Sequence, residues 1–300
     1  MLRVIKCILS LVLVLILVNG CAKQGTSRLT YSIEETKEAI TSTHRKRSDN
    51  LPPIDKDLEA MIQRQLPTQN GIWAVYYKNL ETGCAVSIGN QKMVSASLIK
   101  LFIMGMIYDE IEQGNLKPSE HIESLIEQMI TVSHNASSNE LVAIAANGDF
   151  DAGMKFVNDF AAKMGCSDTE QQRDMLDDRP VPIPQQNYTS VKDCAVLLEK
   201  IYNKECVSES ADEKMLAYLL AQQRDWKIPA GLPAYVKVAN KTGELSSTEN
   251  DVAIVFAEKA DYILCVISNE LENKEQAQQS IRDLSAAVYD YVMQSLEKEK

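Results

Sequence analysis

The sequence predicts a mixed α/β fold of the α+β kind: one antiparallel sheet built from both ends of the folded region, flanked by helices and accompanied by a mostly helical lobe. Two observations carry this prediction. Residues 73–88 and 235–268 show the alternating patterns and turn residues of strands, whereas 122–164 shows the helical spacing of apolar residues. Strands at both ends that enclose a helical middle favour a single sheet made from the two ends.

The individual elements are expected in the following order. An amphipathic helix is predicted over 55–66, with apolar residues at helical spacing. Strands at 73–77 and 84–88 then form a hairpin around a short turn. Residues 166–190 contain three prolines and are expected to form a long functional loop. The other expected elements are helices at 97–114, 191–202, 211–223 and 274–296, and strands at 235–240, 252–257 and 262–268.

The first 20 residues have the pattern of an export signal. Two basic residues precede an apolar run from Cys7 to Val18, which is too short to favour a membrane-spanning helix. The segment Val18-Asn19-Gly20-Cys21 is similar to a bacterial lipobox, which implies cleavage before Cys21 and attachment of lipid to its sulfur. An ordinary signal peptide or an uncleaved anchor is the alternative. We therefore expect a signal peptide at 1–20, a lipidated cysteine and tether at 21–54, and a folded domain at 55–300 on the extracytoplasmic face of the cell membrane.

Composition narrows the classes of function. The formal net charge of −11 disfavours nucleic-acid binding. Only three histidines occur, so a His-rich metal site is not expected, and a Ser-His-Asp hydrolase is disfavoured because only His134 is placed to act as an imidazole base. The seven cysteines include no Cys-x-x-Cys pair, which argues against a zinc site or a thioredoxin-type motif. In a serine enzyme of this composition, lysine is the better candidate for the base.

The segment Ser97-Leu98-Ile99-Lys100 supplies such a pair at the start of an apolar run. If the run is helical, Ser97 and Lys100 lie one turn apart on the same face. Serine is a poor nucleophile without an adjacent base, and a buried lysine can serve when its amine is neutral. A Ser-x-x-Lys match alone is weak evidence, because it occurs by chance in many chains.

Two later motifs strengthen the prediction. Ser133-His134-Asn135 lies about 35 residues after the tetrad, and Lys241-Thr242-Gly243 closes the first of the last three predicted strands. In this order, Ser-x-x-Lys, Ser-x-Asn and Lys-Thr-Gly form the signature of penicillin-recognising serine enzymes. Taken singly, the second motif could cap a helix and the third could be a strand-to-turn exit.

With these motifs, Asn139 and the segment 187–193, residues 55–297 resemble class A β-lactamases and their serine-hydrolase relatives. The resemblance implies that Ser97 is the acylated nucleophile and that Lys100 is its base or proton relay. It also implies that Ser133 shuttles a proton to the departing ring nitrogen. No cofactor is implied.

The resemblance further implies a set of substrate-binding residues. Asn135 would hold the substrate's amide side chain, while Lys241 and Thr242 would bind its carboxylate. Gly243 would let an extended, peptide-like substrate approach the backbone of an edge strand. The backbone N–H groups of Glu244 and of the nucleophile would form the oxyanion hole.

The loop after the helical middle departs from the class A pattern. Class A enzymes carry a glutamate there, which activates the water that releases the acyl-enzyme. Alignment of 169–177 on its threonine and arginine puts Met175 at that position, and methionine cannot act as a general base. Glu170, Asp174 or Asp177 could substitute if the loop is shifted.

Two further departures concern the substrate's surroundings. His134 stands where aspartate is usual, and 250–253 lacks the arginine that many class A enzymes keep for the substrate carboxylate. Lys241 and Thr242 would then bind that group alone.

The function expected from the sequence is a membrane-anchored extracytoplasmic serine hydrolase. It would be acylated at Ser97 by β-lactams, with slow or absent turnover. The alternatives are a hydrolase of cell-wall D-alanyl peptides and a non-hydrolytic penicillin- or peptidoglycan-binding lipoprotein. The expected partners are a β-lactam or peptidoglycan-derived small substrate and, through the lipid anchor, the membrane. We expect a monomer.

Overall fold

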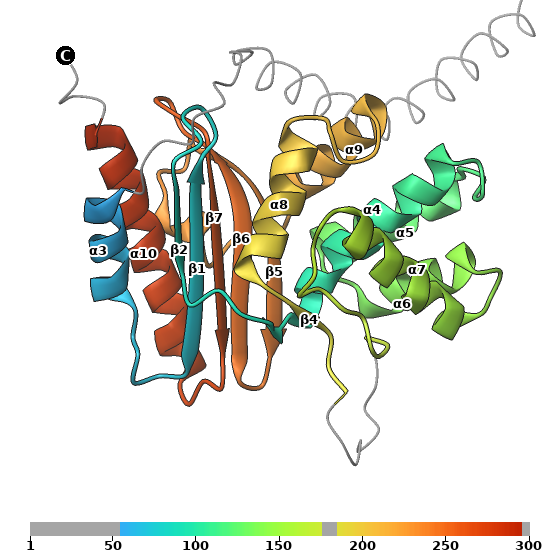
Figure 1. The fold of residues 1–300 in the computed structure, drawn as a ribbon, viewed down its shortest axis with the longest axis horizontal. Helices are drawn as coiled ribbons and strands as arrows, with labels where there is room; N and C mark the ends of the chain where they lie inside the picture. Colours follow the sequence, from blue (N-terminus) through green and yellow to red (C-terminus); the bar gives the residue numbers. More distant parts are fainter. Residues whose placement is uncertain (1–54, 176–184, 296–300) are drawn as a thin grey trace, which may run out of the picture. The chain divides into compact units, whose positions relative to one another are not determined.

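The computed structural model of the chain describes residues 55–175 and 185–295 (Figure 1). The predicted signal peptide, Cys21, the tether and Asp177 lie outside these residues. Within the two ranges, no helix combines the length and the apolar character needed to cross a membrane.

A five-stranded antiparallel sheet forms the centre of the fold and confirms the predicted fold class. Its strand order is β2-β1-β7-β6-β5. β1 pairs with β7 along its whole length, so the two ends of the folded region meet in one sheet. β5 pairs only with β6 and lies at the edge. The five strands are β1 (Ile72–Asn79), β2 (Ala85–Ile88), β5 (Lys237–Leu245), β6 (Thr248–Phe256) and β7 (Tyr262–Asn269).

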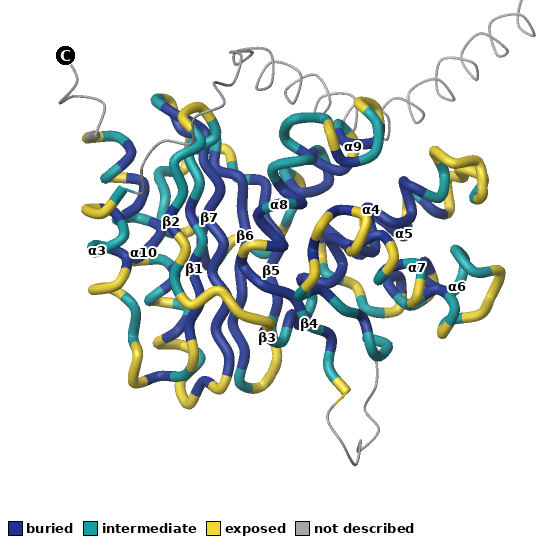
Figure 2. Tube along the Cα trace, in the orientation of Figure 1, coloured by how far each residue is buried: buried dark blue, intermediate teal, exposed yellow. Residues whose placement is uncertain are grey.

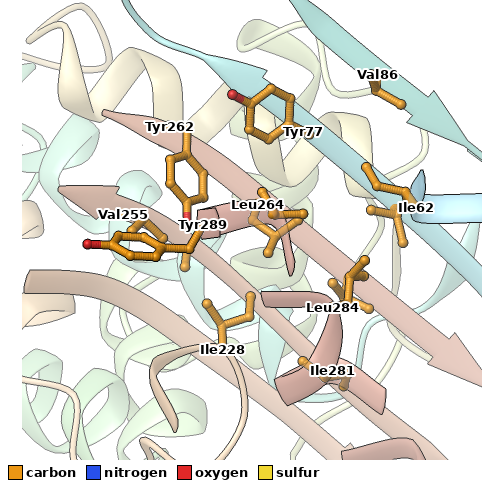
Figure 3. Close-up of a cluster of buried hydrophobic side chains, with 14 of the residues drawn as sticks. Ile62, Tyr77, Val86, Ile228, Val255, Tyr262, Leu264, Ile281, Leu284 and Tyr289 are labelled. Atoms are coloured by element: carbon orange, nitrogen blue, oxygen red, sulfur yellow. The ribbon is translucent and has the colours of Figure 1, made fainter. Parts of the chain in front are cut away.

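Helices cover both faces of this sheet. α3 (Lys56–Gln65) and α10 (Lys274–Ser295) pack on one face, and α8 (Val191–Tyr202) packs on the other (Figure 1). Alternate strand residues therefore enter two different cores, and all eight residues of β7 are buried. Figure 3 shows the core beneath α10, where Tyr77 and Tyr262 from neighbouring strands lie with ring centroids 5.6 Å apart. The predicted helices at both ends of the folded region are confirmed.

The helical lobe is organised around one buried helix. α4 (Ile99–Glu112) is buried from Ile99 to Asp109 and appears as a continuous dark segment in Figure 2. Gly105 lets a neighbouring helix come close, because a Cβ at this position would lie 2.5 Å from the Phe160 ring. A helix that is apolar all round needs neighbours on every side. These neighbours are α5 (Glu120–Thr131), α6 (Asn135–Ala145), α7 (Phe150–Lys163), α8 and α9 (Glu209–Leu220).

Two short 3₁₀ turns and a small second sheet complete the described structure. η1 (Ala96–Leu98) precedes α4, and η2 (Pro229–Gly231) lies between α9 and β5. β3 (Met93–Val94) pairs with β4 (Tyr188–Thr189) and ties the segment before η1 to the end of the long loop.

Two predicted boundaries are wrong in an informative way. The helix expected from residue 97 begins as the 3₁₀ turn η1 and becomes α-helical at Ile99. β5 does not end at Asn240 but continues to Leu245, so the Lys-Thr-Gly motif lies inside the strand. The cause is the β5–β6 hairpin: Leu245 pairs with Thr248 and leaves a two-residue turn, which keeps the strands paired to their ends.

Candidate active site

The turn that carries Ser97 presents its side chain between two buried neighbours. Ala96 and Leu98 are buried, whereas Ser97 is partly exposed. Ala96 has φ +47°, a left-handed conformation that is uncommon for a residue with a Cβ and is often found at functional sites. Within the described ranges, the Ser97 hydroxyl forms no hydrogen bond, so it is available to a reacting group.

The sheet holds this turn from the side of β5. The Asn250 side chain on β6 donates to the carbonyls of Val94 and Ser95, each at 3.1 Å. Gly243 on β5 lies so close that an added Cβ would be 2.7 Å from the Ser95 carbonyl oxygen and 3.3 Å from the Ala96 Cβ. Position 243 therefore requires glycine for a structural reason that the sequence did not reveal: glycine lets the edge strand contact the turn that carries Ser97.

Lys100 lies within reach of the second motif. Its Nζ donates to the Ser133 carbonyl oxygen at 2.6 Å and to Asn135 Oδ1 at 2.7 Å, and it lies 3.2 Å from Ser133 Oγ. Burial, together with the positive charge of Arg224, lowers the pKa of Lys100 to about 7. About half of the lysine is therefore neutral near pH 7.

Ser133 Oγ is shared between two amines. Lys241 Nζ lies 3.0 Å from it and also donates to the Thr242 carbonyl at 2.9 Å. Lys241 is fully buried, and burial, with the charges of Lys100 and Arg224, holds its pKa well below the usual lysine value. Ser133 has φ +60°, so both serines of the site lie in or beside left-handed turns. This arrangement gives one hydroxyl two partners through which a proton can pass.

His134 caps the helix that begins at Asn135. Its Nδ1 accepts from the Ser137 backbone N–H at 3.3 Å and lies 2.8 Å from Ser137 Oγ. The imidazole therefore takes the capping position that an aspartate could occupy. Asn135 is the first helical residue, and its side chain points to Lys100. Helix capping therefore explains His134 but not Ser133 or Asn135. The His134 imidazole is held by Ser137.

Met175 is fixed by its backbone beside α6. Its N–H donates to Asn139 Oδ1 at 2.9 Å, and its sulfur accepts from Asn187 Nδ2 at 3.4 Å. Asn139 lies one helical turn after Asn135, whose side chain accepts a hydrogen bond from Lys100. The contact with Asn139 therefore places Met175 on the same side of α6 as Asn135. The alignment that put Met175 at the glutamate position is consistent with this placement.

Within the described residues, the alternative carboxylates of the loop form no ion pair with Lys100. Glu170 forms an ion pair with Lys92, and this hydrogen bond lowers the pKa of the Glu170 carboxyl. Asp174 is partly buried, and Asp177 lies outside the described residues. Within those residues, Lys100 forms no ion pair.

Arg224 is the site residue that sequence reasoning missed. It lies in the irregular segment between α9 and η2, where no motif marks it. Its Nε donates to the Val132 carbonyl at 3.2 Å, immediately before Ser133, and its Nη1 lies 3.6 Å from Glu244 Oε2. The absence of an arginine from 250–253 predicts that Lys241 and Thr242 bind the substrate carboxylate alone, so it gives no indication of Arg224.

The sequence-predicted residues thus fall into two groups. Hydrogen bonds join Lys100, Ser133, Asn135 and Lys241 directly, and Ser97 precedes Lys100 by one turn. Thr242 is buried on β5, and the Glu244 side chain contacts Lys227 and Arg224, while its backbone remains on the edge strand. The catalytic and binding roles given to these residues stay predictions.

Comparison with known proteins identifies the family of the chain. A family model described as the β-lactamase enzyme family matches residues 54–124 and 121–292. No curated protein matches the sequence.

Among solved structures, PBP-A has a TM-score of 0.71 at 23% identity, covering 83% of this chain and 100% of PBP-A. The β-lactamase from Sphaerobacter thermophilus has a TM-score of 0.68 at 20% identity, with 79% and 97% covered. The TLA-3 extended-spectrum β-lactamase has a TM-score of 0.71 at 17% identity, with 79% and 98% covered. At these identities the likeness is one of fold. The family match spans most of the chain, and the protein therefore belongs to the β-lactamase enzyme family.

Proposed function

We propose that β-lactams acylate Ser97 and that the acyl-enzyme is released slowly or not at all. The observation that carries the proposal is the state of Lys100. Its amine is buried, its pKa is lowered to about 7, and it contacts Ser133 and Asn135 without forming an ion pair within the described residues. A neutral amine at this position can act as a base for acylation.

The contacts of Lys100 suit that role. A neutral amine has two N–H groups and one lone pair. The Ser133 carbonyl and Asn135 Oδ1 are acceptors only, so they take the two N–H groups. The lone pair is then left for a hydroxyl: Ser133 Oγ lies 3.2 Å from the amine, and Ser97 would give its proton to the amine as it attacks the substrate.

The acylation step follows from this arrangement. The Ser97 proton passes to Lys100 as the Oγ–carbon bond forms, and the ring C–N bond then breaks. Ser133 gives its proton to the leaving nitrogen and recovers one from the two amines beside it. The N–H groups of Ser97 and Glu244 would stabilise the oxyanion, which is where donors lower the barrier most.

Arg224 is the residue proposed to anchor the substrate's carboxylate, together with Lys241 and Thr242. Its terminal nitrogens form no hydrogen bond within the described part of the chain, whereas Nε is held by Val132. Arginine is suited to bind a carboxylate through two parallel N–H donors. The guanidinium lies near enough to Lys100 and Lys241 for its charge to lower both pKa values.

Slow release is proposed because Met175 stands where a glutamate would activate water. A solved structure of a PBP-A point mutant is an acyl-enzyme complex with penicillin G, and it matches this chain with a TM-score of 0.71. That complex supports covalent penicillin chemistry on the same fold. Hydrolysis of D-alanyl peptides is the second candidate, because it needs the same acylation step and an edge strand such as β5 for an extended substrate.

Intact-protein mass spectrometry after exposure to benzylpenicillin tests the proposal. We expect one covalent adduct that persists, and no adduct on the matched Ser97→Ala variant. Absence of both adduct and hydrolysis would refute the role of Ser97. Rapid multiple turnover would instead refute the reasoning on Met175. Release of D-alanine from a peptide ending in D-Ala-D-Ala, compared with hydrolysis of a chromogenic cephalosporin, separates the two substrate classes.

We also propose that Cys21 carries lipid and holds the protein on the extracytoplasmic face of the membrane. The support is the lipobox-like segment alone. Fractionation of cells that express the full chain tests it: the protein should pellet with membranes, and Cys21→Ser should release it or block its maturation. A Cys21→Ser protein that has lost its signal peptide and still fractionates with membranes would contradict the proposal.

A further inference from the structure

We propose that the Glu244 carboxylate competes with the substrate's carboxylate for the Arg224 guanidinium. This competition would set how strongly the site prefers anionic substrates to neutral ones. Glu244 would be a specificity-determining residue through its side chain, separately from its backbone N–H. The inference rests on the proposed function, because it takes an acyl donor with a carboxylate as the substrate.

Glu244 faces a second carboxylate across the β5–β6 hairpin. The register of the two strands places it directly opposite Glu249. Two like charges at opposite positions of an antiparallel pair are destabilising. The protein compensates with Lys227, whose Nζ lies 3.0 Å from Glu244 Oε1 and 2.9 Å from Glu249 Oε2.

The two ends of this ion network differ in burial. Lys227 and Glu249 have fully buried side chains, and Glu249 is also held by Lys274 at 3.1 Å and by Gln278 at 3.1 Å. This end is anchored, since removal of either buried partner would leave an uncompensated charge.

The other end is loose and reaches solvent. Glu244 Oε2 lies 3.6 Å from Arg224 Nη1, which is too long for a hydrogen bond. The side chains of Arg224 and Glu244 are 37% and 23% exposed. An ion pair of this geometry and exposure is weak and can be exchanged for another anion.

Exchange would leave no charge unpaired. When a substrate carboxylate takes the terminal nitrogens of Arg224, Glu244 keeps Lys227 through Oε1. Arg224 itself stays in place, because its Nε is bonded to Val132 and its guanidinium lies 5.7 Å from the Trp226 ring centroid. The competition therefore needs no rearrangement of the backbone, and its only cost is the lost Arg224–Glu244 attraction.

The test compares two acyl donors on Glu244→Gln. Benzylpenicillin has the carboxylate and its methyl ester lacks it, so the ratio of their second-order acylation rates, measured by intact-protein mass spectrometry, reports carboxylate recognition. Glutamine still offers Oε1 to Lys227 but no longer competes for Arg224. We expect the ratio to rise about 2- to 5-fold, the range that corresponds to a weak surface ion pair. A purely structural disturbance would change both rates by the same factor.

A second background isolates the mechanism. In Arg224→Met, the substitution Glu244→Gln should no longer change the ratio, because the residue competed for is absent. If Glu244→Gln leaves the ratio unchanged or lowers it while Arg224 is present, the inference is overturned. A rise that persists in Arg224→Met would also overturn it, since it would indicate general charge repulsion. If neither donor acylates the unaltered protein, the proposed function itself fails and this inference falls with it.

Discussion

The lowered pKa of Lys100 makes the rate of acylation depend on pH in a defined direction. The pKa is about 7, with burial as the main cause and the charge of Arg224 as the second. Only the neutral amine can accept the Ser97 proton. The neutral fraction is about nine-tenths at pH 8 and about one-tenth at pH 6, so the second-order rate constant should fall about tenfold between them. Above pH 8 the rate should level off.

Removal of the Arg224 charge tests the direction of this pH dependence. Arg224→Met removes a positive charge that disfavours protonation of Lys100, so the profile should move to higher pH. The assay is the initial rate of adduct formation with a fluorescent penicillin over pH 5.5–9, with thermal unfolding at each pH to confirm that the protein stays folded. Lys100→Arg is the matched control, because arginine remains protonated and should abolish acylation. A flat profile between pH 6 and 8, or a rate that rises as pH falls, would show that Lys100 is not the base.

Three further substitutions test separate parts of the site. Met175→Glu should shorten the lifetime of the penicillin adduct at least tenfold, because a general base typically contributes 10²–10⁴-fold; an unchanged lifetime would mean that the side chain does not reach the attacking water. Gly243→Ala should lower the free energy of unfolding by about 1–3 kcal/mol in urea titration, since the new Cβ would overlap the Ser95 carbonyl; a loss below about 0.5 kcal/mol would mean that the turn gives way easily. His134→Ala should remove about 1 kcal/mol through loss of the helix cap, whereas His134→Asp should retain it; equal stability of the two variants would contradict the capping role.

The sheet and its helices were predictable because their residues obey local patterns. β7 and α10 have the periodicity of elements whose apolar residues enter a core, and the structure confirms both. The second half of β5 was not predictable in the same way. Residues 241–245 carry a lysine, a threonine and a glutamate that serve the site and the ion network, so the apolar alternation is lost although the strand continues.

The residues of the site also differ in whether local sequence patterns could predict them. Ser97, Lys100 and Ser133 could be named from sequence because they stand in motifs of fixed spacing. Arg224 and Lys227 could not, because they lie in an irregular segment and reach the site only through contacts with β5 and the turn before Ser133. Local spacing says nothing about such contacts.

The proposed acylation and release steps would be linked through the electrostatics of one lysine. Met175 is held by Asn139, one helical turn from the Asn135 side chain that binds Lys100. A glutamate at 175 would supply a base for water, but its negative charge would also favour the protonated form of Lys100. The expected gain in release would therefore come with slower acylation at neutral pH. In Met175→Glu, the adduct lifetime should fall while the acylation profile moves to higher pH, and a shorter lifetime with no shift of the profile would show that the two groups do not interact.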